Sequence, residues 1–160
     1  MTTTSEPSAV GLDVADQLAI RRLVDRYFLA VDDAAADEVA SMFTEDGVLG
    51  FTRSNPDSGP SGERRGRSEI AAQTAWLGTQ YLQTGHICAS QELLPGTDPV
   101  RGRVRCVAHH IRQDDGNALT RTVFLHYDDV YVKEADGEWR FASRNLVIGC
   151  TVTHPVEVVG

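Results

Sequence analysis

The sequence predicts an α+β domain in which a curved, cone-shaped antiparallel sheet packs against three N-terminal helices. Two observations support this fold class. Apolar residues recur at helical spacing in the first half of the chain, whereas the chain from Gly85 onward is rich in Val, Ile, Thr and aromatic residues. Helices first and strands joined by tight turns second is the order typical of α+β proteins. A sheet that curves over helices leaves an apolar pocket at the open end of the cone.

Length and composition indicate one globular domain. The chain has 160 residues, 41% of them hydrophobic and 24% charged, which is ordinary for a soluble protein. We expect residues 1–12 to be a disordered arm, 13–152 the single domain and 153–160 a tail. The net charge of −8 argues against nucleic acid as a partner. No signal-peptide pattern and no apolar run of about 18 residues occurs, so we expect a cytoplasmic protein without membrane contact.

The first helix is predicted to begin after Asp13, a candidate N-cap residue, and to end near Asp33. Its apolar residues follow the i, i+3, i+4, i+7 pattern of a helix with one buried face: Ile20, Leu23, Val24, Tyr27, Phe28 and Val31. At about 100° per residue, Asp32 lies on the flank of this face, whereas Asp33 points away from it. Asp32 is therefore the carboxylate expected to face the interior.

The remaining elements follow from the same patterns. A short second helix is expected at 38–43, a strand at 48–53 and a third helix from Ser68 to about Tyr81. A long loop rich in Pro, Gly and Ser, at 54–66, separates that strand from the third helix and is interpreted as a lid or a mobile segment. The hairpin turns fall at 114–117 and 135–137, and the four long strands are expected at 86–94, 102–113, 118–133 and 138–152.

With these elements in place, the chain resembles the SnoaL-like branch of the nuclear transport factor two-like superfamily, over about residues 14–150. The landmarks that carry the resemblance are 30–32, 42–47, His86, 127–129 and 136–145. The branch includes scytalone dehydratase, hexachlorocyclohexane dehydrochlorinase and polyketide cyclases. The resemblance implies a cystatin-like α+β barrel, a homodimer and chemistry without a cofactor.

By this resemblance, Asp32 and His86 match a catalytic dyad in which the histidine takes a proton from the substrate and the aspartate orients it. The residue types suit the task. Histidine titrates near neutral pH, and a buried carboxylate raises its proton affinity and fixes its tautomer. The alternative is that Asp32 only caps the helix and His86 is a structural strand histidine. A helix C-terminus is unfavourable for an aspartate, which weakens that alternative.

Other candidate site residues lie on the strands. His109 and His110 are adjacent, so they face opposite sides of their strand. We favour His110 as the inward one because it shares the more apolar face, and because the dehydratase also has a second pocket histidine. His109 is kept as the alternative. By resemblance, Arg144 matches a pocket arginine of the dehydrochlorinase.

Three further residues are candidates for the pocket. Tyr27 stands where the dehydrochlorinase has a lysine, so chloride abstraction is not implied, and Val31 stands where the dehydratase has a tyrosine. Phe124 and Asp128 share one face of their strand and are expected to line the pocket. The opposite face carries aromatic residues as well, and the strand pattern does not decide between the two faces.

The expected function is that of a cofactor-independent lyase, isomerase or cyclase, with dehydration as the first choice. The substrate would be small and hydrophobic, of polyketide, terpenoid or steroid type. The alternatives are a ligand-binding or assembly module and a small oxygenase subunit of the same fold. No metal, nucleotide or serine-nucleophile motif occurs. Three arginines beside the long loop are interpreted as a solvated rim, with steering of an anionic substrate as the less favoured reading: Arg64, Arg65 and Arg67.

Overall fold

The computed structural model describes residues 11–55, 61–94 and 97–158. Apart from its last two residues, the expected disordered arm lies outside this part of the chain. The helices lie in the first half of the chain, and the four longest strands lie in the second half. The elements are α1 (Val14–Asp32), α2 (Ala36–Ser41), β1 (Phe43–Arg53), β2 (Gly62–Arg65), α3 (Gly66–Gln80), β3 (Gln83–Leu94), β4 (Val100–Asp114), β5 (Asn117–Lys133) and β6 (Trp139–Val156). None of these helices is both long and apolar enough to span a membrane.

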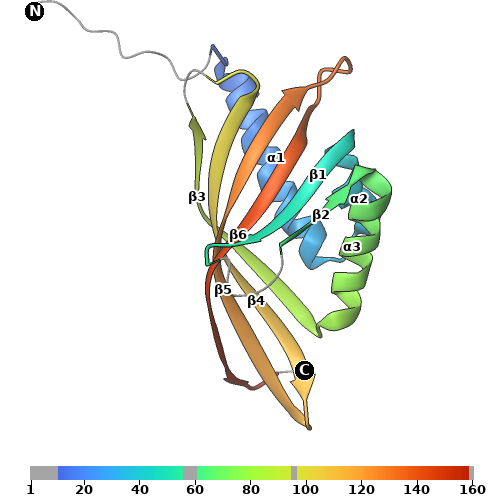
Figure 1. The fold of residues 1–160 in the computed structure, drawn as a ribbon, viewed down its shortest axis with the longest axis vertical. Helices are drawn as coiled ribbons and strands as arrows, with labels where there is room; N and C mark the ends of the chain where they lie inside the picture. Colours follow the sequence, from blue (N-terminus) through green and yellow to red (C-terminus); the bar gives the residue numbers. More distant parts are fainter. Residues whose placement is uncertain (1–10, 56–60, 95–96, 159–160) are drawn as a thin grey trace, which may run out of the picture.

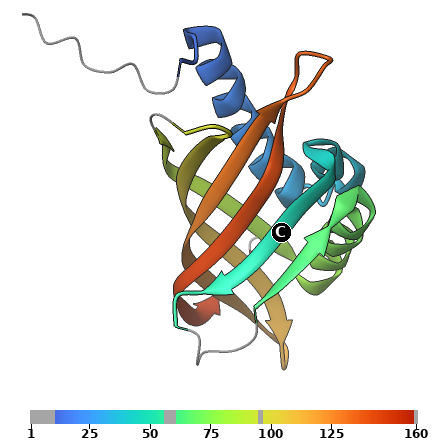
Figure 2. The ribbon, with the colours of Figure 1, turned by 45° about the horizontal axis from the view of Figure 1, so that its top comes forward.

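The strands form one curved sheet in the order β2-β1-β6-β5-β4-β3. Neighbouring strands are antiparallel except β1 and β6, which run parallel. The edge strands β2 and β3 do not pair with each other, so the sheet remains open. Helix α1 lies against one face of the sheet, and α2 and α3 lie beside β1 and β2 (Figures 1 and 2). The predicted α+β class is confirmed, but the sheet is not a closed barrel and is not purely antiparallel.

Strands β1, β2 and β6 differ from the predicted ones, and β3 and β4 begin two or three residues earlier than predicted. Strand β1 begins at Phe43 rather than at Val48, and β6 continues to Val156 through the first residues of the expected tail. Strand β2 lies inside the segment predicted to be a loop. Its four residues, Gly-Glu-Arg-Arg, have no apolar alternation, and they form a strand because they pair with the open edge of β1.

Helix α1 has the capping and the burial that its sequence predicts. The Asp13 carboxylate accepts a hydrogen bond of 2.8 Å from the backbone N–H of Asp16. The predicted apolar face is buried, and its residues pack with the inward side chains of the sheet into one core. Asp32 is the last residue of the helix. Its side chain therefore projects at the point where the helix meets the sheet.

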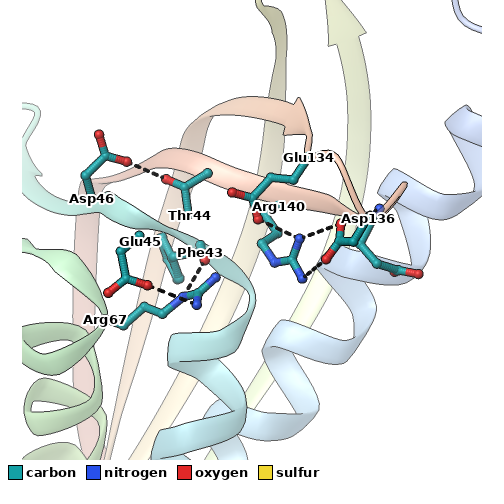
Figure 3. Close-up of polar contacts among 9 residues, drawn as sticks. Phe43, Thr44, Glu45, Asp46, Arg67, Glu134, Asp136 and Arg140 are labelled. Atoms are coloured by element: carbon teal, nitrogen blue, oxygen red, sulfur yellow. Dashed lines mark hydrogen bonds and ion pairs between the residues drawn. The ribbon is translucent and has the colours of Figure 1, made fainter.

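Two arginines join neighbouring elements: Arg67 joins α3 to β1, and Arg140 joins the two strands of the last hairpin (Figure 3). The Nε of Arg67, in the first turn of α3, donates to the Phe43 carbonyl oxygen at 2.9 Å, and its Nη1 lies 3.2 Å from a Glu45 carboxylate oxygen. Arg140, on β6, pairs with Glu134 at 2.6 Å and with Asp136 at 2.7 Å. The Arg67 contacts hold α3 against the start of β1, and the Arg140 pairs tie together the hairpin between β5 and β6.

Candidate active site

A cavity of about 330 Å³ lies between α1, α3 and the inner face of the sheet, near the lower end of the range for small-molecule sites. Most of its lining is apolar or aromatic. A more open hollow of about 650 Å³ adjoins the cavity beside α3 and shares Phe51, Gln73 and Trp76 with it. The histidines that line the cavity are His86 from β3 and His110 from β4.

Asp32 and His86 contact each other directly. The His86 Nδ1 lies 2.6 Å from Oδ1 of Asp32, and the backbone N–H of His86 donates to Oδ2 at 2.9 Å. The hydroxyl of Thr84, two residues earlier on β3, donates to Oδ1 at 2.9 Å. The His86 side chain is only 5% exposed. The end of α1 and the start of β3 therefore hold the imidazole in one orientation at the cavity wall.

The environment of Asp32 keeps it ionised. Burial alone would raise the pKa of the carboxyl group, but the hydrogen bonds from His86 and Thr84 outweigh burial and lower the pKa below 3.8. A carboxylate only accepts hydrogen bonds, so the proton between the two groups belongs to His86 Nδ1. In the neutral imidazole, Nε2 then carries a lone pair that is available to accept a proton. The ring of Phe28 stacks on His86 at 5.8 Å.

His110 faces the same cavity. Its ring lies 5.6 Å from the ring of His86 and stacks on Tyr81 at 4.6 Å. Neither of its nitrogens has a hydrogen-bond partner in the described part of the chain. Burial, and after it the nearby His86 and Arg121 side chains, lower the pKa of His110 to about 4, so it is neutral at pH 7.

His109, the neighbour of His110 on β4, does not line the cavity. Its Nδ1 lies 3.0 Å from the Thr122 hydroxyl. The structure thus has the arrangement favoured from the sequence, with His110 inward.

Tyr27 lines the cavity, but Arg144 does not. Burial raises the pKa of Tyr27 to about 12, so its phenol stays protonated. The Arg144 side chain has no exposed surface, and its guanidinium carbon lies 4.2 Å and 4.0 Å from the ring centres of Tyr27 and Tyr127. Arg144 therefore does not line this cavity, where the resemblance had placed it as a pocket residue. The tyrosine rings cover the guanidinium, which supports the cavity wall from behind.

The expectation that Phe124 and Asp128 line the cavity is also wrong. Phe124 is 44% exposed and lines a separate hollow on the opposite face of β5. Asp128 is on that face too and pairs with Arg103 at 2.7 Å. The other face of β5 points inward, with Tyr127 and Tyr131 buried in the core. Both faces of β5 carry apolar residues, so alternation alone did not separate them.

Four residues at the site were not identified from the sequence. Thr84 has a recognisable signal, because a residue two positions before His86 lies on the same face of the strand. Arg121 lies opposite His110 in the β4–β5 register, and Tyr81 and Arg53 also line the cavity. These three depend on strand register and on the path of the chain after α3, which no local pattern reveals.

The rim arginines have protein partners. Arg65 pairs with Glu63 at 2.7 Å, and Arg64 donates to the side-chain oxygen of Gln73 at 3.0 Å. Arg67 is occupied with β1 as described above. Within the described residues, no group of three or more His, Cys, Asp and Glu side chains is placed to hold a metal ion.

Comparisons with known proteins agree with this architecture. A family model described as "SnoaL-like domain" matches residues 13–145. Many solved structures are similar in fold, among them the following three. The Kfla4162 protein from Kribbella flavida is 20% identical, with a TM-score of 0.71 over 86% of this chain and 93% of that one. A hexachlorocyclohexane dehydrochlorinase (LinA) Type2 is 19% identical, with a TM-score of 0.64 over 91% and 92%.

The third structure is ActVI-ORFA from Streptomyces coelicolor, which is 20% identical, with a TM-score of 0.60 over 82% of this chain and 96% of that one. A search of curated proteins gave no significant match. At these identities the solved structures bear on the fold, whereas the family model covers most of the chain. The chain therefore belongs to the SnoaL-like domain family of the nuclear transport factor two-like superfamily.

Proposed function

We propose that the protein is a cofactor-independent acid/base enzyme, a lyase, isomerase or cyclase, with dehydration as the first choice. Its substrate would be a small hydrophobic molecule of polyketide, terpenoid or steroid type. The observation that carries this proposal is the 2.6 Å contact between His86 Nδ1 and Asp32 at the wall of a mainly apolar cavity. An imidazole oriented by a carboxylate, with its other nitrogen free, is suited to take a proton from carbon.

In the proposed dehydration, His86 Nε2 removes a proton from the carbon next to a carbonyl group. The electron pair of that C–H bond forms a C=C bond as the C–O bond of a β-hydroxyl group breaks. The imidazolium then returns the proton to the departing hydroxyl, which leaves as water. Asp32 stabilises the imidazolium throughout and stays ionised, as its lowered pKa favours.

Charge that develops on the carbonyl oxygen needs a hydrogen-bond donor. The phenol of Tyr27 lines the cavity and remains protonated because burial raises its pKa, so it is a proposed donor to that oxygen. His110 is the second proposed partner, because its two ring nitrogens have no partner among the described residues. Arg144 lies behind the ring of Tyr27 and is proposed to position it rather than to bind substrate.

The proton-abstraction step can be tested without the natural substrate. We expect the protein to accelerate deuterium exchange at C1 of 2-tetralone in D2O, measured by NMR. His86→Ala and Asp32→Asn should each slow this exchange by about 100-fold or more, with unchanged circular dichroism spectra.

His109→Ala is the matched control, since this histidine is absent from the cavity lining. Retained exchange in both dyad variants would contradict the proposed base. No acceleration by the wild-type protein would favour a ligand-binding or assembly module.

A further inference from the structure

The charges at the cavity wall are opposite in sign to the charge of the protein. The chain carries 23 acidic and 15 basic residues. Yet the described residues that line the cavity include Arg53 and Arg121 and not one Asp or Glu. The ionised Asp32 carboxylate lies behind His86, outside the cavity lining, and its oxygens accept hydrogen bonds from His86. The formal charges among the described lining residues are therefore positive only.

Arg121 is placed by the register of three strands. On β4, His110 pairs with Thr84 of β3 on one side and with Arg121 of β5 on the other. Directly paired residues in a sheet point to the same face, and Thr84 and His110 both face inward. Arg121 is thus the next inward side chain after His110 in a row that begins beside the dyad.

Arg53 approaches from another part of the sheet. It is the last residue of β1 and pairs with Ile148 of β6, which also lines the cavity. Strand β6 lies between β1 and β5, so the two arginines reach the cavity from strands on either side of β6.

Neither arginine has a side-chain hydrogen bond or ion pair with any described residue, although each is partly buried. Several other arginines among the described residues have such partners, as Arg103 has in Asp128 and Arg140 in Asp136. A guanidinium that loses water on ligand binding requires an acceptor, and a carboxylate matches its planar fork best. A carboxylate on the ligand would supply such an acceptor.

We propose that Arg53 and Arg121 bind a carboxylate group on the substrate. The substrate would then be an apolar acid, whose body fills the cavity and whose carboxylate lies beyond His110, on the side away from His86. This inference deepens the proposed function, since it concerns the same cavity, but it depends on binding and not on turnover.

The test compares 1-naphthoate with 1-naphthamide, which differ in charge and hardly in shape. Isothermal titration calorimetry on the full chain should give a dissociation constant for naphthoate at least about tenfold lower than for naphthamide. Arg121→Gln and Arg53→Gln should each weaken naphthoate binding by about tenfold and leave naphthamide binding nearly unchanged. Arg22→Gln is the matched control, because Arg22 is an exposed arginine of α1 outside the cavity lining.

A lack of preference for naphthoate, whether by equal affinity or by no binding up to millimolar concentration, would overturn the inference. So would unchanged naphthoate affinity in the Arg53→Gln/Arg121→Gln double variant. Thermal denaturation of each variant separates loss of the site from loss of the fold. The exchange test of the dyad uses a neutral ketone, so it can fail while carboxylate binding succeeds, and the reverse.

Discussion

The Nε of Arg144 lies 3.7 Å from Oδ1 of Asp129, and neither side chain has any exposed surface. The distance is too long for a hydrogen bond, and the guanidinium nitrogens have no partner among the described residues. Aromatic rings surround the guanidinium instead. Burial raises the pKa of Asp129, and the nearby positive charge of Arg144 partly offsets that rise. The attraction between the Arg144 and Asp129 charges thus stabilises both groups in the core, where they form few hydrogen bonds.

This pair leads to a stability prediction. Asp129→Asn leaves the Arg144 charge buried without a counter-charge and should lower the free energy of unfolding by about 3–5 kcal/mol. Asp129→Asn combined with Arg144→Met removes both charges and should be less destabilising than Asp129→Asn alone. Urea denaturation of the wild type, of Asp129→Asn, of Arg144→Met and of the double variant measures the coupling. A loss below about 1 kcal/mol for Asp129→Asn would contradict the account of this pair.

His110 should make the protein sensitive to mild acid. Its pKa is about 4 in the folded chain, against 6.5 for the free side chain. The unfolded state therefore binds the proton first on acidification, and stability falls from about pH 6.5 to about pH 4, by about 2–3 kcal/mol. The lowered pKa of Asp32 acts below pH 3.8, outside this window.

The His110 prediction is tested by urea denaturation at several pH values across this window. His110→Gln should have a flatter stability profile than the wild type, because it lacks the group that titrates. Parallel profiles for the two proteins would show that another group is responsible.

Thr84 should act through Asp32. Thr84→Val removes the hydroxyl that donates to Oδ1 and should raise the pKa of Asp32, because that hydrogen bond lowers it. We expect the rate of 2-tetralone exchange to fall by about tenfold, with the acid limb of its pH profile moved to higher pH. Thr84→Ser keeps the hydroxyl and should restore both values. Equal rates in Thr84→Val and wild type would argue that the hydroxyl has no part in orienting the carboxylate.

The outer face of the sheet should carry the expected homodimer contact. Ile87, Phe124 and Val152 are 56%, 44% and 51% exposed, and exposed apolar groups of this kind mark interaction surfaces. Phe124→Asp places a charge on this face and should convert a dimer into a monomer, measured by sedimentation velocity. Leu29→Asp is the control, since Leu29 is an exposed apolar residue of α1. A wild-type monomer at high concentration would contradict the dimer.

The residues that could be placed from the sequence are those whose position follows from local periodicity. Helical phase identified Tyr27 and Asp32, and strand alternation with the apolar face identified His110. The location of Arg144 could not be predicted, because its burial depends on aromatic rings from α1, from β5 and from its own strand, β6. Phe124 was misplaced because both faces of β5 carry large apolar side chains. Strand β2 was missed because its partner, and not its composition, makes it a strand.

The histidines and Arg121 of the cavity lie on strands, whereas helix α3 forms another part of its wall. The two histidines and Arg121 are on β3, β4 and β5, whereas Gln73, Trp76 and neighbouring side chains come from α3. Substitutions along α3 can therefore reshape the chamber without moving any group that titrates. In natural or directed evolution, substitutions in α3 would therefore change substrate specificity with the smallest loss of catalytic activity.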